Sequence, residues 1–174
     1  MTTKTLAYSA LMAALSVVLA RLFGMMPNEA SRFSIEAVPI FLAGMLFGPI
    51  PGALVGFAAD AVGCLFSPFG YNPIFCIPPI LYGLIGGLFR KFLCKKVSIF
   101  RIGLILLLPV SLGSILYQSA TLAFMYYDGL FLKGFVFYLS TRSVQFAITF
   151  VVDALIIFFL CKSKMFRRMG VWPV

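Results

Sequence analysis

The stretch Ser31–Pro79, SRFSIEAVPIFLAGMLFGPIPGALVGFAADAVGCLFSPFGYNPIFCIPP, decides how this 174-residue chain folds. It is apolar enough to lie in a lipid bilayer, yet it contains Arg32, Glu36 and Asp60 and is interrupted by proline, glycine and a polar turn. A charged side chain in an apolar membrane segment is costly, so it usually faces a cavity or a partner. We therefore predict two short membrane helices and a loop that together form the wall of a ligand pocket.

The composition of the chain indicates an integral membrane protein. Hydrophobic residues make up 62% and charged residues 11%, whereas soluble domains average about 45–50% and about 25%. The net charge of +9 does not indicate nucleic-acid binding, because Lys and Arg also set the topology of membrane proteins. The length is that of one domain, so we expect a single membrane domain covering residues 1–174.

Six apolar segments predict an all-α bundle of six transmembrane helices. A spanning helix needs about 20 mostly apolar residues, and two neighbouring segments are shorter because GPIPG at residues 48–52 is a strong helix breaker. Short, interrupted membrane segments often border a binding site; a re-entrant hairpin without a ligand is the alternative. The predicted helices cover residues 5–23, 35–47, 52–66, 73–93, 102–127 and 135–161.

The distribution of basic residues predicts the orientation of these helices. With the N-terminus inside, the cytoplasmic segments hold ten of the 14 Lys and Arg residues, as the positive-inside rule requires. Both termini should then be cytoplasmic, and the first apolar segment, which lacks a small-residue cleavage site, should remain as a helix. The ten are Lys4, Arg90, Lys91, Lys95, Lys96, Arg101, Lys162, Lys164, Arg167 and Arg168. The four on the outer side are Arg21, Arg32, Lys133 and Arg142.

A polar stripe follows the last apolar segment. Its residues are spaced by three, four and four positions, so they share one face of a helix that is otherwise apolar. They are Arg142, Gln145, Thr149 and Asp153. Arg142 should lie near the outer end and Asp153 deeper. For Asp153, and for Asp60 in the third segment, a structural ion pair or hydrogen bond between helices is the alternative to a ligand contact.

The predicted outer loop, Ser67–Pro73, combines turn-forming residues with Phe69, Tyr71 and Asn72. Aromatic residues at a membrane interface often serve only to anchor a helix. Here they accompany the outer arginines and the carboxylates already named, which together suit a flat, polar, anionic heterocycle. Aromatic rings stack on such a ring, a carboxylate accepts its paired N–H donors, and an arginine binds a carboxylate through two hydrogen bonds.

The first helix carries a small-x-x-x-small pair, Ala10 and Ala14. This spacing lets another helix approach closely in lipid. Ordinary packing inside the bundle is the alternative.

The sequence lacks the motifs of metal sites and of common catalytic sites. It contains no histidine, and its four cysteines are scattered without a C-x-x-C spacing, so we expect small core residues and no zinc site. No G-x-x-x-x-G-K-[ST] motif is present, so we expect no ATP hydrolysis through a P-loop. A nucleophile elbow, a zincin motif and a carboxylate pair at catalytic spacing are missing as well, so we expect no enzymatic activity and no cofactor. Energy for transport would come from an ion gradient or from another protein.

Together these features resemble the substrate-binding S components of the energy-coupling factor (ECF) vitamin transporters. The alanine pair of the first helix is one element of the resemblance. RFSIEAVPIFLAGMLFGPIPGALVGFAAD at residues 32–60, SPFGYNP at residues 67–73 and the proline-rich helix after it resemble the folate-type members. The resemblance implies a six-helix subunit in a prokaryotic cell membrane that captures a vitamin from outside. It also implies a transmembrane coupling subunit and two ATPase subunits as partners.

The resemblance and the side-chain chemistry together give the expected site. Ala10 and Ala14 would contact the coupling subunit. The expected ligand residues are the charged, amide and aromatic side chains of the outer half: Arg21, Arg32 and Arg142 for the glutamate carboxylates or pterin acceptors, Glu36 and Asp60 for the pterin N–H donors, Phe69, Tyr71 and Asn72 to stack on or cap the ring, and Gln145 for an amide contact.

Two other functions fit the sequence. An S component could serve another vitamin, such as riboflavin, pantothenate or a queuine-like base, although outer arginines and a membrane carboxylate suit a pterin-glutamate better than neutral riboflavin. A self-sufficient ion-coupled transporter would use Asp60, Asp153 and Glu36 as an ion relay. Against it, 174 residues leave little room for two alternating halves, and no internal repeat is evident.

Overall fold

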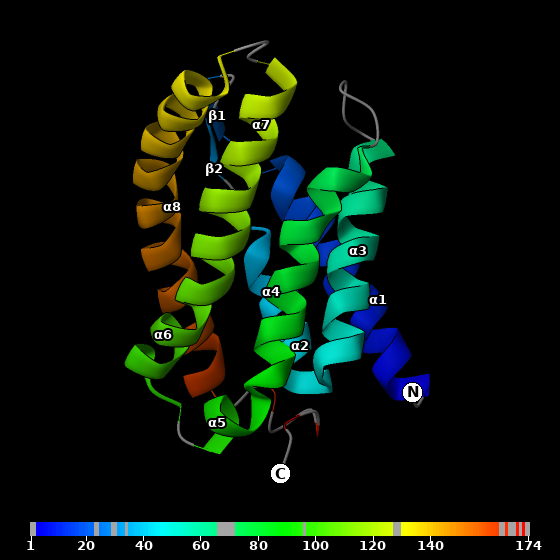
Figure 1. Cartoon of the computed structure of the whole chain (residues 1–174). Coiled ribbons are helices and arrows are strands. Elements are labelled where there is room, and N and C mark those ends of the chain that lie inside the picture. The colour runs from blue at the N-terminus through cyan, green and yellow to red at the C-terminus, as the bar shows by residue number, and fades with distance from the viewer. Residues whose placement is uncertain are drawn as a thin grey trace.

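The chain forms a helical bundle (Figure 1), seen in a computed structural model that describes residues 3–22, 25–28, 31–33, 35–65, 72–95, 97–126, 130–163, 166, 170 and 172. The elements in chain order are α1 (Thr3–Leu22), β1 (Met25–Asn28), β2 (Ser31–Phe33), α2 (Ala37–Phe47), α3 (Pro49–Leu65), the 3-10 helix η1 (Pro73–Cys76), α4 (Ile77–Leu88), α5 (Arg90–Lys95), α6 (Ile99–Pro109), the π-helix η2 (Val110–Tyr117), α7 (Gln118–Tyr126) and α8 (Phe131–Lys162).

Three helical stretches are long and apolar enough to cross a membrane: Thr3–Arg21, Ile99–Tyr126 and Phe131–Lys162. Three shorter apolar stretches accompany them: Ala37–Phe47, Pro49–Leu65 and Pro73–Leu88. The prediction of a helical membrane protein is thereby confirmed. The antiparallel hairpin of β1 and β2 was not predicted and is a small addition to the helices.

The two ends of the bundle differ in what they carry (Figure 1). The start of α1, the short helix α5 and the end of α8 lie together at one end, which we call the α5 end. The hairpin, the end of α7 and the start of α8 lie at the opposite end, which we call the hairpin end. Side chains on α8 are therefore ordered by depth, from Phe131 at the hairpin end to Lys162 at the α5 end.

Helices α2, α3 and α4 pack backbone against backbone through glycines. A Cβ atom added to Gly44 would meet the carbonyl oxygen of Gly83, and one added to Gly83 would meet the carbonyl oxygen of Gly52. A Cβ atom on Gly52 would in turn meet the Cα atom of Gly44 at 2.5 Å. The residues Val38 to Leu46 of α2 are all buried in this contact and the surrounding core. Gly52 of α3 therefore forms part of a close helix–helix contact.

Two helices differ from their predicted ranges for reasons of backbone geometry. Within the GPIPG motif, Gly48 alone separates the two helices: its φ of +106°, which glycine adopts readily, ends α2. Helix α3 then begins at Pro49 rather than Gly52, because proline is tolerated in the first turn of a helix. The fourth predicted helix starts as the 3-10 turn η1 and ends with α4 at Leu88, and α5 begins as a separate element at Arg90.

The helix from Ile99 to Tyr126 contains a change of helix type. Pro109 lacks a backbone N–H and stands at the end of α6, and the π-helix η2 follows it at once. Short π-helical turns inside α-helices are rare and frequently mark functional sites. Ser114 lies within η2, and Gln118 is the first residue of α7.

Candidate ligand-binding site

The predicted polar stripe on α8 faces the inside of the bundle. Gln145 and Asp153 are each 3% exposed, and Thr149 is 8% exposed. Helix α8 packs against α6, η2 and α7 along this length. The Thr149 hydroxyl donates to backbone carbonyls of its own helix, at 3.3 Å from the Gln145 oxygen. Polar groups in a bundle interior need partners, and the hydroxyl of Thr149 finds its partners within its own helix.

Arg142 forms the hairpin-end part of this stripe. Its Nη1 donates to the Oε1 atom of Gln118 at 2.6 Å, and its guanidinium carbon lies 5.9 Å from the centre of the Phe146 ring. The Nε atom is buried and has no hydrogen-bond partner among the residues that the structure describes. Because an arginine has five N–H donors, Arg142 can bind an acceptor on a ligand while it keeps its contact with α7.

Asp153 forms the deeper part of the stripe, eleven positions further along α8. Its Oδ1 atom is buried and accepts no hydrogen bond from the described part of the chain. Leaving a carboxylate oxygen without a donor in an apolar interior is costly. A ligand that brings N–H groups to Asp153 would remove this cost.

Tyr82 of α4 and Ser114 of η2 complete the deep part of the site. Their hydroxyl groups lie 3.1 Å apart in a buried hydrogen bond. Helix α4 contacts η2, η2 contacts α8, and α2 contacts both α4 and α8, so the elements that carry these side chains pack together. We call Tyr82, Ser114, Gln118, Arg142, Gln145, Thr149 and Asp153 the polar cluster.

Glu36 lies next to this polar cluster, at the start of α2. It is half-buried, and its backbone carbonyl oxygen accepts a hydrogen bond of 2.8 Å from the hydroxyl of Ser16 on α1. Arg32 belongs to strand β2, but its side chain lies outside the described residues. Phe69 and Tyr71 also lie outside the described residues. Their expected ligand contacts therefore stay predictions.

Three further residues predicted to bind the ligand form hydrogen bonds within the protein instead. Arg21, at the end of α1, donates through Nη2 to the carbonyl oxygen of Gly63 on α3. Asp60 accepts from the Cys76 thiol at 2.7 Å, which ties α3 to η1. The Asn72 side chain caps η1 by accepting from the backbone N–H of Ile74 at 3.1 Å. For Asp60, this is the interhelical hydrogen bond that the sequence left open as an alternative.

Ala10 and Ala14 lie on an exposed face of α1. Packing inside the bundle, the alternative considered for this pair, does not account for that position. A face of small residues that points away from the bundle is available to a helix of another subunit.

Sequence reasoning missed three residues of the polar cluster: Tyr82, Ser114 and Gln118. Each belongs to a segment that was treated only as an apolar span. A signal was nevertheless present, because Ser114 and Gln118 are spaced by four positions and therefore share a helix face. Tyr82 offers no comparable pattern, because its meaning depends on the contact of α4 with η2.

Comparisons with known proteins identify relatives of the chain. A family model described as "ECF-type riboflavin transporter, S component" matches residues 1–163. The folate transporter FolT of Clostridium novyi (strain NT) is 31% identical over 152 residues, which cover 87% of this chain and 84% of the relative.

Two solved structures are similar over nearly the whole chain. A crystal structure of FolT bound with folic acid matches with a TM-score of 0.78 and 30% identity, over 93% of this chain and 95% of that chain. The S component for biotin from an ECF-type ABC transporter matches with a TM-score of 0.69 and 22% identity over the same shares, so it shares the fold. With the family match over residues 1–163, the chain belongs to the S components of the ECF-type riboflavin transporter family.

Proposed function

We propose that this chain captures a folate-like vitamin as the substrate-binding subunit of an ATP-driven ECF importer. The family gives the transporter class. The 31% identical relative is a folate transporter, and the 30% identical structure has folic acid bound. Both relatives favour folate over the other vitamins that the sequence left open.

The observation that carries the proposal is that Arg142 and Asp153 share one face of α8, where the Arg142 Nε and Asp153 Oδ1 atoms are buried and have no hydrogen-bond partner in the described part of the chain. Eleven residues of α-helix correspond to about 16 Å, which is comparable to the extended length of a molecule with a pterin at one end and a glutamate at the other. In this proposal Arg142 binds a glutamate carboxylate, and Asp153 accepts N–H groups of the pterin. Tyr82 and Gln145 contact the ring or its linker between these two points.

The other predicted residues extend this site toward the hairpin end. We propose that Arg32 and Arg21 add positive charge for the glutamate, and that Glu36 adds a second carboxylate near the pterin. Phe69, Tyr71 and Asn72 are proposed to cover the ligand from the outer loop. Asp60 fits a ligand role less well, because its carboxylate already accepts from Cys76.

Riboflavin is the second candidate, because the matching family is described by that vitamin. Riboflavin carries no carboxylate, so it would leave the Arg142 Nε atom without an anionic partner. The biotin S component is only 22% identical to this chain, so it gives no evidence about which ligand the chain binds. Competition separates the candidates: excess folic acid should displace a bound tracer, and excess riboflavin should not.

The proposal includes the arrangement of the protein in the membrane. We propose a single domain of six spanning segments with both termini in the cytoplasm of a prokaryotic cell. The basic residues that gather in the segments toward the α5 end support this orientation. A transmembrane coupling subunit and two ATPase subunits would supply the energy, and the exposed pair Ala10 and Ala14 would dock to the coupling subunit.

The experiment that tests the function is identification of the bound molecule. The protein is purified in mild detergent and denatured, and released small molecules are identified by mass spectrometry and pterin fluorescence. We expect a folate in near-equal amount to the protein, or tight binding of added folic acid by calorimetry. Release of a different vitamin, together with failure to bind added folic acid, would contradict the folate assignment but leave the S-component role.

A further inference from the structure

Two of the four cysteines lie beside the same carboxylate oxygen, on Asp60. The thiol of Cys76 donates to the Oδ2 atom of Asp60 at 2.7 Å, and the sulfur of Cys64 lies 3.9 Å from the same oxygen. The two sulfur atoms are therefore no further apart than the sum of these two distances. None of these three residues belongs to the polar cluster, so the proposed vitamin site gives the thiol pair no role.

The packing of α3 against the start of α4 brings these side chains together. Asp60 and Cys64 are four positions apart on α3, so they share one face of that helix. Cys76 is the last residue of η1, which contacts α3. One turn before Asp60, a Cβ atom on Gly56 would meet the carbonyl oxygen of Pro79, so the two helices touch through their backbones. This close contact fixes the cysteines of the two segments beside each other.

The two cysteines differ in exposure. Cys64 is half-buried, whereas Cys76 is 3% exposed. A thiol reacts with a dissolved reagent only where the reagent reaches it. A buried thiol can still react with a sulfur atom next to it, through a mixed-disulfide intermediate. Cys64 is therefore the thiol that meets a reagent, and Cys76 is placed to react with Cys64.

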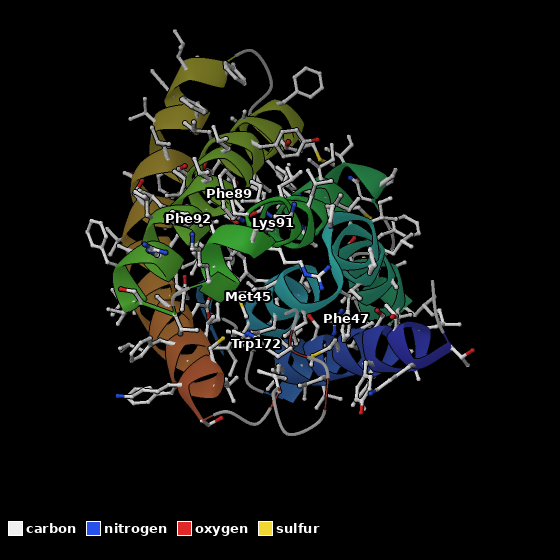
Figure 2. All side chains as sticks on the ribbon, turned by 90° about the horizontal axis from the view of Figure 1, so that it is seen from below. Met45, Phe47, Phe89, Lys91, Phe92 and Trp172 are labelled. Carbon is white, nitrogen blue, oxygen red and sulfur yellow. The ribbon has the colours of Figure 1, made fainter. Side chains whose placement is uncertain are left out.

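The other two cysteines lie toward the α5 end and provide a comparison within the same chain. Cys94 of α5 contacts the carbonyl oxygen of Met45, with 3.7 Å between the sulfur and oxygen atoms, and Met45 is seen from that end in Figure 2. Cys161 lies near the end of α8. The end of α3 and the start of α4 lie toward the hairpin end (Figure 1). In the proposed orientation the hairpin end faces the outside, where disulfides persist, and the α5 end faces the reducing cytoplasm.

We propose that Cys64 and Cys76 are a redox-active pair, which a low-molecular-weight disulfide oxidises to a disulfide bond between α3 and η1. The Cys64 sulfur attacks the small disulfide, which forms a mixed disulfide and releases one small thiol that takes the Cys64 proton. The Cys76 sulfur then attacks the Cys64 sulfur and releases the second small thiol. The Cys76 proton passes to this thiol through Asp60, along the existing hydrogen bond. The protein loses two electrons and two protons, and the small disulfide gains them as two thiols.

The bond would replace a reversible contact of η1 by a covalent one. In the reduced protein the Cys76 thiol holds η1 to α3 by its hydrogen bond to Asp60. At the other end of η1, the Asn72 Nδ2 atom lies 3.7 Å from the Met125 sulfur of α7. A disulfide would fix the α3 side of this bridge and would close a short loop in the unfolded chain. The melting temperature should therefore rise on oxidation.

The test is a map of the disulfides after oxidation. The full chain, purified in detergent, is incubated with oxidised glutathione, the remaining thiols are alkylated, and the protein is digested without reduction. A protease that cuts after aromatic residues separates the two cysteines, because Phe69 and Tyr71 stand between them in the sequence. We expect a cross-linked pair of peptides that contain Cys64 and Cys76, lighter by two hydrogen atoms than the two thiol peptides together. Cys94 and Cys161 should be alkylated.

Single variants assign the reaction to the pair. Cys64→Ser and Cys76→Ser should each lose the cross-link and the rise in melting temperature. Cys76→Ser should instead keep glutathione on Cys64. Cys94→Ser and Cys161→Ser are the matched controls and should retain both effects. A cooperative unfolding transition before oxidation shows that each variant is folded.

Four results would overturn the proposal. The first is a wild-type protein in which glutathione stays on Cys64 and no cross-link forms. The second is no reaction of Cys64 with oxidised glutathione. The third is a cross-link that joins Cys94 to Cys161 or joins two chains. The fourth is loss of the cross-link in Cys94→Ser or Cys161→Ser as complete as in Cys64→Ser. The measurement uses no vitamin and no membrane, so its outcome is independent of the folate assignment.

Discussion

The guanidinium of Arg142 and the side-chain amide of Gln118 join α8 to α7 through a hydrogen bond of 2.6 Å. The same arginine keeps a buried Nε atom that finds no acceptor in the described part of the protein. One side of Arg142 is therefore fixed by the protein, and the other side is available to a ligand. A side chain that is positioned in this way loses little entropy when it binds.

Replacement of Arg142 by glutamine should weaken folic acid binding by about 1.5–3 kcal/mol, the usual contribution of a charged hydrogen bond. If Arg142 binds the glutamate, pteroic acid, which lacks that part, should lose much less affinity. Calorimetric titration of both ligands against wild type and Arg142→Gln measures the difference. Equal losses for the two ligands would show that Arg142 supports the fold of the site rather than the glutamate.

Asp153→Asn should also weaken folate binding by about 1.5–3 kcal/mol, because the amide presents an N–H where the pterin also donates. The ligand-free protein should be as stable as wild type or more stable, because a buried carboxylate oxygen without a donor is replaced by a neutral group. Thr149→Val is the control on the same face, since the Thr149 hydroxyl bonds to its own helix. An unchanged dissociation constant for Asp153→Asn, with a lowered melting temperature, would assign Asp153 a structural role.

Gly83→Ala should lower the free energy of unfolding by about 1–3 kcal/mol or more, because the new methyl group overlaps the carbonyl oxygen of Gly52. Neither helix can relieve this overlap by a rotamer change, since the opposing atoms are backbone. Gly103→Ala is the matched control: its Cβ would lie 3.6 Å from the Phe150 ring, an ordinary contact. That variant should be unchanged or gain up to about 1 kcal/mol from helix propensity. Thermal unfolding in detergent, with and without ligand, gives the comparison.

Ala14→Trp should abolish uptake while leaving folate binding intact, because Ala14 is exposed and no residue of the polar cluster belongs to α1. Val144→Trp controls for a large side chain in the lipid, since Val144 is 65% exposed on α8. Uptake is measured in vesicles that contain the complete importer, and binding is measured with the subunit alone. Full uptake by Ala14→Trp would exclude a docking role for this face.

The sequence predicted those parts of the fold that depend on local pattern. The apolar spans, the break at Gly48 and the inward polar face of α8 all follow from spacing and from glycine and proline chemistry. The end of α4 at Leu88 and the hairpin of β1 and β2 were not predicted. Both depend on how these segments pack against the rest of the bundle, and no residue pattern marks them.

Of the candidate site, the sequence predicted the inward position of the polar residues on α8. Arg142 and Gln145 stand out because α8 is otherwise apolar. Tyr82 and Ser114 belong to the cluster because their hydroxyl groups form a hydrogen bond of 3.1 Å. They are 32 positions apart in the sequence, so no local pattern predicts this contact. Asp60 was predicted as a ligand residue because an acidic side chain is unusual in an apolar segment. In the structure its carboxylate accepts a hydrogen bond from the Cys76 thiol of η1.

The π-helix η2 sets the angular register between the two halves of the helix from Ile99 to Tyr126. A π-turn contains more residues than an α-turn, so the side chains that follow it are rotated relative to an unbroken α-helix. Each residue of an α-helix corresponds to a rotation of about 100°. An unbroken α-helix of the same residues would therefore turn Gln118 away from Arg142. The hydrogen bond between α7 and α8 therefore depends on the wider turns of η2, which determine which side chains of α7 face α8.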